Sequence, residues 1–128
     1  MADRFKSAQP YTLRKATVTG AGNAPGANTD ILSTDLTPDR TVSAYRITVA
    51  CDTGTVFNVM IDDGSSATHA FGLNGNTALT AGAIYTFVFG VTATDDGLKN
   101  GTACSYNFQV ETDSDIHLLV DEVHGPVI

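Results

Sequence analysis

The side chains best able to do chemistry in this sequence are three histidines and four groups of acids. No Ser lies in the G-x-S-x-G pattern of an activated nucleophile, and His69, His117 and His124 lie in unrelated contexts. No H-x-H or H-E-x-x-H pair is present to bind zinc. His117 lies between Ile116 and Leu118 in an apolar run, which is typical of a structural histidine. The sequence therefore predicts no catalytic residue and no enzyme.

The acids cluster in or beside predicted turns, where carboxylates are able to bind calcium. The groups are Asp62–Asp63, Asp95–Asp96, Asp113/Asp115 and Asp121–Glu122. None matches the D-x-[DN]-x-[DN]-G loop, and Asp is common in turns because its carboxylate bonds nearby backbone amides. Structural turns are the favoured interpretation, with a calcium site as the alternative. A glycoside hydrolase would need sugar-stacking aromatics, and the chain has no Trp. No metal or cofactor is predicted.

Composition indicates one ordinary domain whose surface suits contact with other proteins. The chain has 128 residues, of which 42% are hydrophobic and only 16% charged, against roughly 25% charged in typical soluble domains. Thr, Ser, Asn, Gly and Ala then fill much of the surface, which suits close contact with other proteins. The alternative is a mildly polar β domain with no such role.

The charge balance disfavours nucleic acid and anionic membranes as partners. The net charge is −7, and an acidic surface repels phosphate backbones and anionic lipids. Four of the seven bases, Arg4, Lys6, Arg14 and Lys15, lie in the first fifteen residues. This basic segment either docks on an acidic neighbour, including another copy, or is a solubilising tail.

The start MADRFKSAQPY has no apolar core, so we expect no secretory signal and synthesis in the cytosol. No run is long enough for a transmembrane helix.

The hydrophobic pattern predicts strands and no helix. No stretch keeps an i, i+3, i+4, i+7 apolar pattern over three turns, whereas short β-rich runs recur between Gly- and Asp-containing breaks. The predicted strands are 12–19, 29–36, 41–51, 55–62, 68–73, 83–91, 104–111 and 115–123.

Turn chemistry between these runs predicts an antiparallel β-sandwich or jelly-roll-like barrel of about eight strands. CDTG at 51–54 and DDGSS at 62–66 suit hairpins, and TDDGLKNGT at 94–102 suits a long hairpin tip. NGN at 74–76 suits a turn with positive φ. GAGNAPGAN at 20–28 has no side chain able to fill a core, so it is read as a linker. We therefore divide the chain into an extended N-terminal arm with its linker, 1–28, and a sandwich domain, 29–128.

Two predicted strands are apolar on both faces, which one small core does not require. Strand 104–111 alternates cleanly, with Tyr106, Phe108 and Val110 facing inward. Strand 83–91 does not alternate, and strand 115–123 adds apolar residues to the face opposite Ile116, Leu118 and Val120. We interpret the surplus as an interface with another subunit. The candidate interface residues are Leu13, Val18, Tyr85, Phe87, Val88, Phe89, Leu119 and Val123.

The two cysteines, Cys51 and Cys104, lie at strand ends in phase with apolar neighbours. They belong to no C-x-x-C pair or metal-ligand cluster. Two interpretations stay open: two buried thiols, or a disulfide between strands that forms outside the reducing cytosol.

The C-terminal half resembles small β-sandwich virion proteins of tailed phages, such as head decoration (cement) proteins and related minor structural proteins. The resemblance is carried by L-x-A-G-x-x-Y-x-F at 79–87, YNFQ at 106–109 and L-x-V-x-E-V at 118–123, over roughly 50 residues. It implies a compact oligomer, often a trimer, whose N-terminal arm grips neighbours on a capsid. No individual functional residue follows from it.

The leading hypothesis is thus a viral structural protein that stabilises a capsid as a symmetric homo-oligomer, trimer or larger. Its further partner would be a major capsid protein or another virion protein, and its location the virion. One alternative is a self-assembling extracellular filament subunit, in which residues 12–19 complete the next subunit's sheet. Another is a carbohydrate- or calcium-binding β-sandwich module.

Overall fold

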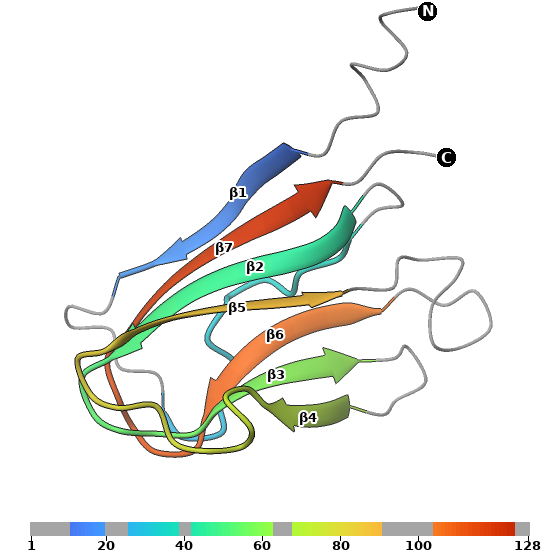
Figure 1. The fold of residues 1–128 in the computed structure, drawn as a ribbon. Coiled ribbons are helices and arrows are strands. Elements are labelled where there is room, and N and C mark those ends of the chain that lie inside the picture. The colour runs from blue at the N-terminus through green and yellow to red at the C-terminus, as the bar shows by residue number, and fades with distance from the viewer. Residues whose placement is uncertain (1–10, 20–25, 39–41, 63–67, 91–103, 125–128) are drawn as a thin grey trace, which may run out of the picture.

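A computed structural model describes residues 11–19, 26–38, 42–62, 68–90 and 104–124, which form two antiparallel sheets (Figure 1). The larger sheet has the order β1-β7-β2-β5. Its strands are β1 (Tyr11–Val18), β7 (Ile116–His124), β2 (Val42–Cys51) and β5 (Ile84–Gly90). The smaller sheet has the order β4-β3-β6, formed by β4 (Thr68–Gly72), β3 (Phe57–Asp62) and β6 (Ser105–Val110). The predicted all-β antiparallel sandwich is confirmed.

Aromatic side chains from both sheets interlock in the core. The ring of Tyr45 on β2 lies 5.8 Å from that of Tyr106 on β6, and Phe89 on β5 lies 6.3 Å from both Tyr106 and Phe108. Phe57 of β3 stacks on Phe108 at 5.5 Å. Full burial of one such side chain is worth about 1.5–3 kcal/mol. These rings hold the two sheets face to face.

The predicted inward residues of β6 and β7 are buried. Tyr106, Phe108 and Val110 line the core from β6, and Ile116, Leu118 and Val120 line it from β7. The period-2 alternation of apolar side chains therefore gave the correct core face for both strands.

Two of the predicted hairpins are wrong, because the strands on either side belong to different sheets. β2 pairs with β5 and β7, so the chain after Cys51 must cross to the smaller sheet to begin β3. Residues 52–56 make this corner. The chain likewise changes sheets between β5 and β6, around residues 94–102, which lie outside the described residues.

The other two turn predictions agree with the structure. β3 and β4 pair as antiparallel neighbours around the DDGSS segment, from Asp62↔Thr68 onward. Asn74, Gly75 and Asn76 all have positive φ, between 61° and 63°. Asn and Gly tolerate this left-handed conformation better than other residues, which explains the NGN sequence.

At the sheet-crossing corner, the Asp52 carboxylate ties the end of β2 to the start of β7. It accepts the Asp115 amide at 2.8 Å and the Ser114 hydroxyl at 3.0 Å. These hydrogen bonds, the Asp115 amide first, lower the pKa of Asp52 below its ordinary value.

The predicted strand at 29–36 is also wrong: this segment runs beside β6 with only one isolated bridge, Leu36↔Tyr106. Elsewhere its pairing is irregular, with the Ile31 amide donating to the Phe108 carbonyl at 2.8 Å. Opposite Leu32, the buried Asn107 side chain takes the place of the regular backbone hydrogen bonds between paired strands. Its oxygen accepts the Leu32 amide and its nitrogen donates to the Leu32 carbonyl, both at 3.0 Å. Such side-chain bonds compete with regular sheet pairing, which the strand-like pattern could not reveal.

β1 lies within the segment assigned to the arm, 1–28, and pairs with β7 of its own chain. The register runs from Tyr11↔His124 to Val18↔Leu118, with an irregularity between Arg14 and Ala16. Most of its side chains are exposed, and only Ala16 and Val18 pack against the core. β1 is thus the lightly buried edge strand of the larger sheet.

Cys51 and Cys104 are free thiols, and both are buried. Burial raises the pKa of the Cys51 thiol. The structure therefore agrees with the interpretation as two buried thiols and not with the disulfide.

Replacing Asn107 by Leu tests the role of its side chain in holding residues 29–36. The substitution keeps the branching at Cγ but leaves the buried Leu32 amide and carbonyl without their partner, so we expect a loss of about 2 kcal/mol in the free energy of unfolding. Urea denaturation at 25 °C measures it. Gln109→Leu is the matched control, since Gln109 bonds Asp30 in an exposed position. Equal losses in both variants would contradict the assignment.

Candidate interaction surface

The outer face of the larger sheet, called here the outer sheet face, is the side turned away from the core. Residues paired across neighbouring antiparallel strands lie on the same face, so the register defines four rows across β5, β2, β7 and β1. These rows are Ile84-Ala50-His117, Thr86-Thr48-Leu119-Thr17, Val88-Arg46-Asp121-Arg14 and Gly90-Ala44-Val123-Thr12.

Large apolar side chains lie open on this face. Ile84 is 76% exposed and Val88 63% exposed, and Leu119 and Val123 are half-buried beside them. A hollow of about 210 Å³ opens between Ile84, Leu119 and Thr17. An open apolar sheet face of this kind is typical of a protein contact site.

One charged row crosses the apolar face. The Asp121 carboxylate accepts hydrogen bonds from Arg14 Nε of β1 and from Arg46 Nη2 of β2, the latter at 3.1 Å. Asp121 is nearly buried, while both guanidinium groups remain about half exposed. The Arg14 hydrogen bond is the main cause that lowers the pKa of Asp121, and the Arg46 bond adds to it. The row carries two cations and one anion.

The structure divides the eight candidate interface residues between the two faces of the sheet. The outer sheet face holds Val88, Leu119 and Val123. The inner face holds Tyr85, Phe87, Phe89 and Val18, which pack against the core, and Leu13, which lies opposite Glu122 and is 52% exposed. Two residues of the outer sheet face that the sequence did not single out are Ile84 and Arg46. Ile84 lies within the predicted strand 83–91, and strict alternation from Val88 would have found it.

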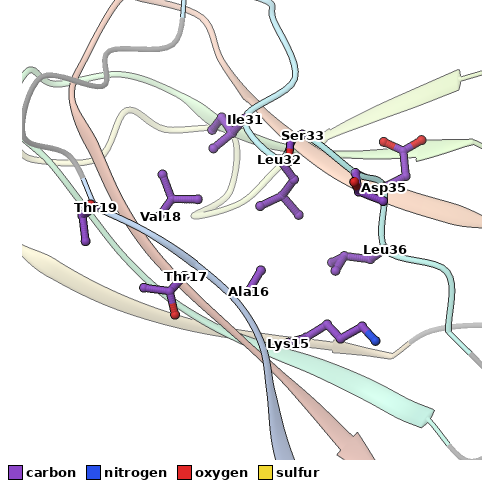
Figure 2. A pocket seen from close by; sticks show the side chains of 11 residues that line it. Lys15, Ala16, Thr17, Val18, Thr19, Ile31, Leu32, Ser33, Asp35 and Leu36 are labelled. Carbon is purple, nitrogen blue, oxygen red and sulfur yellow. The ribbon is translucent and has the colours of Figure 1, made fainter.

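A cleft of about 590 Å³ opens between β1 and residues 31–36 (Figure 2). Ala16 and Val18 project into it from β1, and Ile31, Leu32 and Leu36 face them from the other side. Its volume is in the range of small-ligand sites. Six of its eleven lining residues are polar or charged, so the cleft lacks the mainly apolar walls of such sites.

A second hollow, of about 340 Å³, lies on the outer face of the smaller sheet. Three carboxylates, Asp30, Asp35 and Asp62, line it. Asp30 accepts the Gln109 amide at 2.9 Å, and Asp35 accepts the Asn107 amide at 2.7 Å. We call this surface the acidic sheet face. The carboxylates do not converge: no group of three or more His, Cys, Asp or Glu in the described part of the chain is arranged to hold a metal ion.

Charge is segregated between the two sheets. Within the described ranges, all three Lys and Arg residues lie on the larger sheet: Arg14, Lys15 and Arg46. That sheet carries two acids, Asp121 and Glu122, so its net charge is +1. The other seven described acids lie elsewhere, on the acidic sheet face and in the loops. Sequence order alone could not show this separation, because it arises from which strands share a sheet.

The histidines lie apart, on different elements. His69 is exposed on β4, and His117 is exposed on the outer sheet face. His124 is buried at the end of β7, where its Nε2 lies 2.9 Å from Oε1 of Glu122 and its ring stacks on Tyr11. The stacking of Tyr11 on His124 joins the start of β1 to the end of β7.

No protein-family model matches this chain, and no curated protein matches it in sequence. The described residues include no helix long and apolar enough to cross a membrane. Functional inference therefore depends on the surfaces described above.

Alanine substitutions of the neighbours Phe89 and Val88 distinguish the two faces of β5. Phe89→Ala removes a ring packed between Tyr45, Tyr106 and Phe108, and we expect it to cost about 3 kcal/mol of unfolding free energy. Val88→Ala removes an exposed side chain and should change stability by less than about 0.5 kcal/mol. Chemical denaturation at a protein concentration where the chain is monomeric measures both. Similar losses would contradict the assigned faces.

Replacing Asp121 by Asn tests the charged row through its pH dependence. Because the pKa of Asp121 is lowered in the folded chain, its stabilising effect is present above the unfolded pKa of about 3.9 and lost as pH falls through the folded pKa. We expect Asp121→Asn to be less stable than wild type by about 1 kcal/mol at pH 7. The difference should shrink below about pH 4. Urea denaturation across pH 2.5–7 measures it, and a difference independent of pH would contradict the charge role.

Proposed function

We propose that this chain is a structural protein of a virion that decorates and stabilises a capsid, and that it assembles as a symmetric homo-oligomer through the outer sheet face. The virion setting is supported by the resemblance of the C-terminal half to phage decoration proteins. The mode of assembly is supported by the structure of the sheet. Further partners are a major capsid protein or another virion protein.

The observation that carries the assembly proposal is the exposure of Ile84 and Val88 on a sheet face with further apolar side chains beside them. Soluble monomers rarely leave a continuous apolar patch on a sheet open to water. Association would bury this patch, at roughly 25 cal/mol per Å² of apolar surface removed from water. The same contact repeated by symmetry would reinforce a shell.

The edge strand gives the proposal a second support. β1 pairs with β7 within the chain and anchors the outer sheet face through Arg14 and Asp121. Residues 1–10, at the N-terminal end of β1, carry Arg4 and Lys6. We propose that this basic segment docks on an acidic neighbour, which is the role that the sequence suggested for the arm.

Aspartate substitutions on the outer sheet face test the assembly. Val88→Asp and Ile84→Asp place a charge where we propose contact, so both should reduce the assembly to 13.4 kDa monomers with a thermal midpoint close to that of wild type. Size-exclusion chromatography with light scattering and negative-stain imaging measure the state. Phe71→Asp on β4 is the matched control, since Phe71 is similarly exposed, at 54%, but lies on the other sheet.

Wild-type protein that remains monomeric at high concentration would contradict the assembly proposal. So would assembly that is equally sensitive to Phe71→Asp. The virion setting has its own test: we expect the coding region to lie among genes for capsid and head-assembly proteins, and a location among cell-surface genes would favour the filament alternative.

A further inference from the structure

β5 lies at an edge of the larger sheet, since the order β1-β7-β2-β5 gives it one hydrogen-bonded neighbour among the described strands, β2. Its pairing with β2 is regular over seven residue pairs, from Ala50↔Ile84 to Ala44↔Gly90. In an antiparallel pair, alternate residues of a strand direct their N–H and C=O groups to the neighbour, and the residues between them direct theirs to the other side. β5 can therefore accept a further strand along its outward side.

The other three edges carry features that natural sheets use against strand addition. β1 has two cations, Arg14 and Lys15, and an irregularity in its register beside them. β4 is only five residues long. The edge of β6 is bonded to the segment 28–36, where the amides of Asn28, Ile31 and Leu36 donate to the carbonyls of Val110, Phe108 and Tyr106. The sequence of β5, IYTFVFG, has no charged residue and no Pro, and its register has no irregularity.

The side chains of β5 keep exposed surface on both faces of the sheet. On the inner face, its three aromatic residues are only half-buried although their partners on β2 are fully buried: Tyr85 opposite Val49, Phe87 opposite Ile47 and Phe89 opposite Tyr45. The rings of Tyr85 and Phe87 stack along the strand with centroids 6.0 Å apart. On the outer face, Ile84, Thr86 and Val88 are exposed. A strand laid along β5 would cover apolar surface on both faces.

A second copy of β5 suits this edge. Two identical strands can pair antiparallel about a twofold axis, and overlap of all seven residues places that axis at Phe87. Thr86 of one copy then faces Val88 of the other, and Tyr85 faces Phe89. Aromatic pairs across strands are favourable, whereas like charges that face each other are not. Because β5 carries no charge, this pairing sets no like charges opposite each other.

We propose that two copies of the chain pair antiparallel through β5 about a twofold axis, in a contact called here the edge dimer. It joins their two four-stranded sheets into one sheet of eight strands, and it covers the half-buried rings of Tyr85, Phe87 and Phe89. The outer sheet faces stay open and become continuous across the two copies. This inference goes beyond the proposed function, because it adds an edge contact to assembly through the outer sheet face.

Hydrogen exchange on wild-type protein tests the backbone pairing. The β5 amides that point away from β2 should exchange at least about tenfold more slowly at concentrations where light scattering shows assembly than in the dilute monomer. The outward amides of β1 are the internal control and should exchange equally at both concentrations. Equal rates for β5 in protein that still assembles would overturn the edge dimer and leave the proposed function standing.

Cysteine substitutions test the register. An equimolar mixture of Thr86→Cys and Val88→Cys, oxidised with glutathione disulfide, should give more covalent dimer than either variant alone, because the register brings the two positions to about 5 Å. Thr48→Cys is the matched control. Thr48 lies opposite Thr86 on β2, and three strand spacings of about 4.8 Å separate its two copies in the edge dimer. As much covalent dimer from Thr48→Cys as from the mixture would overturn the edge dimer.

Lysine substitutions separate the edge dimer from the proposed function. Thr86→Lys places a cation on the edge strand, so it should weaken the edge dimer at least about tenfold in Kd and abolish the slowed exchange of β5. Thr48→Lys, one strand further in, should keep the slowed exchange and lose any assembly larger than the dimer. If β5 keeps its slowed exchange in Thr86→Lys, the edge dimer is wrong. If Thr48→Lys forms larger assemblies like wild type, the proposed function fails and the edge dimer stands.

Discussion

The packing of Tyr45 and Phe89 against Tyr106 and Phe108 is the contact on which the rest of this structure depends. It places β2 and β5 of the larger sheet over β6 of the smaller one. Once these strands face each other, the inner faces of β3 and β7 are covered by the same core. Each sheet then has only one face left for water or for a partner. The properties of the molecule's surface follow from which side chains the sheet pleat turns outward.

The two sheets resolve this constraint differently. The smaller sheet carries polar side chains on its outer face, and the segment 29–36, which Asn107 ties to β6, runs along its edge. The larger sheet keeps apolar side chains outside, on the opposite faces of β5 and β7 from those that fill the core. A strand such as β5 therefore uses both of its faces: Phe89 contributes to the fold, while Val88 contributes nothing to the core and is free for a contact.

Much of the architecture could be predicted from the sequence because it depends on local alternation. The inward sets of β6 and β7 and seven of the eight predicted strands agree with the structure. Two kinds of feature could not be predicted. Whether CDTG joins paired strands depends on partners distant in the sequence, and so does the position of Arg46 between Val88 and Asp121. Residues 29–36 have a strand-like pattern but form no regular strand, because side-chain hydrogen bonds from Asn107 hold the backbone of Leu32, 75 positions away in the sequence.

Segregated charge also explains how an open apolar sheet face is compatible with specificity. The chain carries a net charge of −7, so two copies that approach at random repel each other at long range. Over its described strands the larger sheet has a net charge of +1, so this repulsion is weaker there than around the seven other described acids. An apolar patch alone would bind any apolar surface. Placed around the Arg14–Asp121–Arg46 row, it would favour a partner that brings carboxylates to the two arginines, because an apolar surface would desolvate two guanidinium groups that share a single carboxylate. In the proposed contact, the apolar side chains would supply the affinity, and the charged row would select the surface that binds.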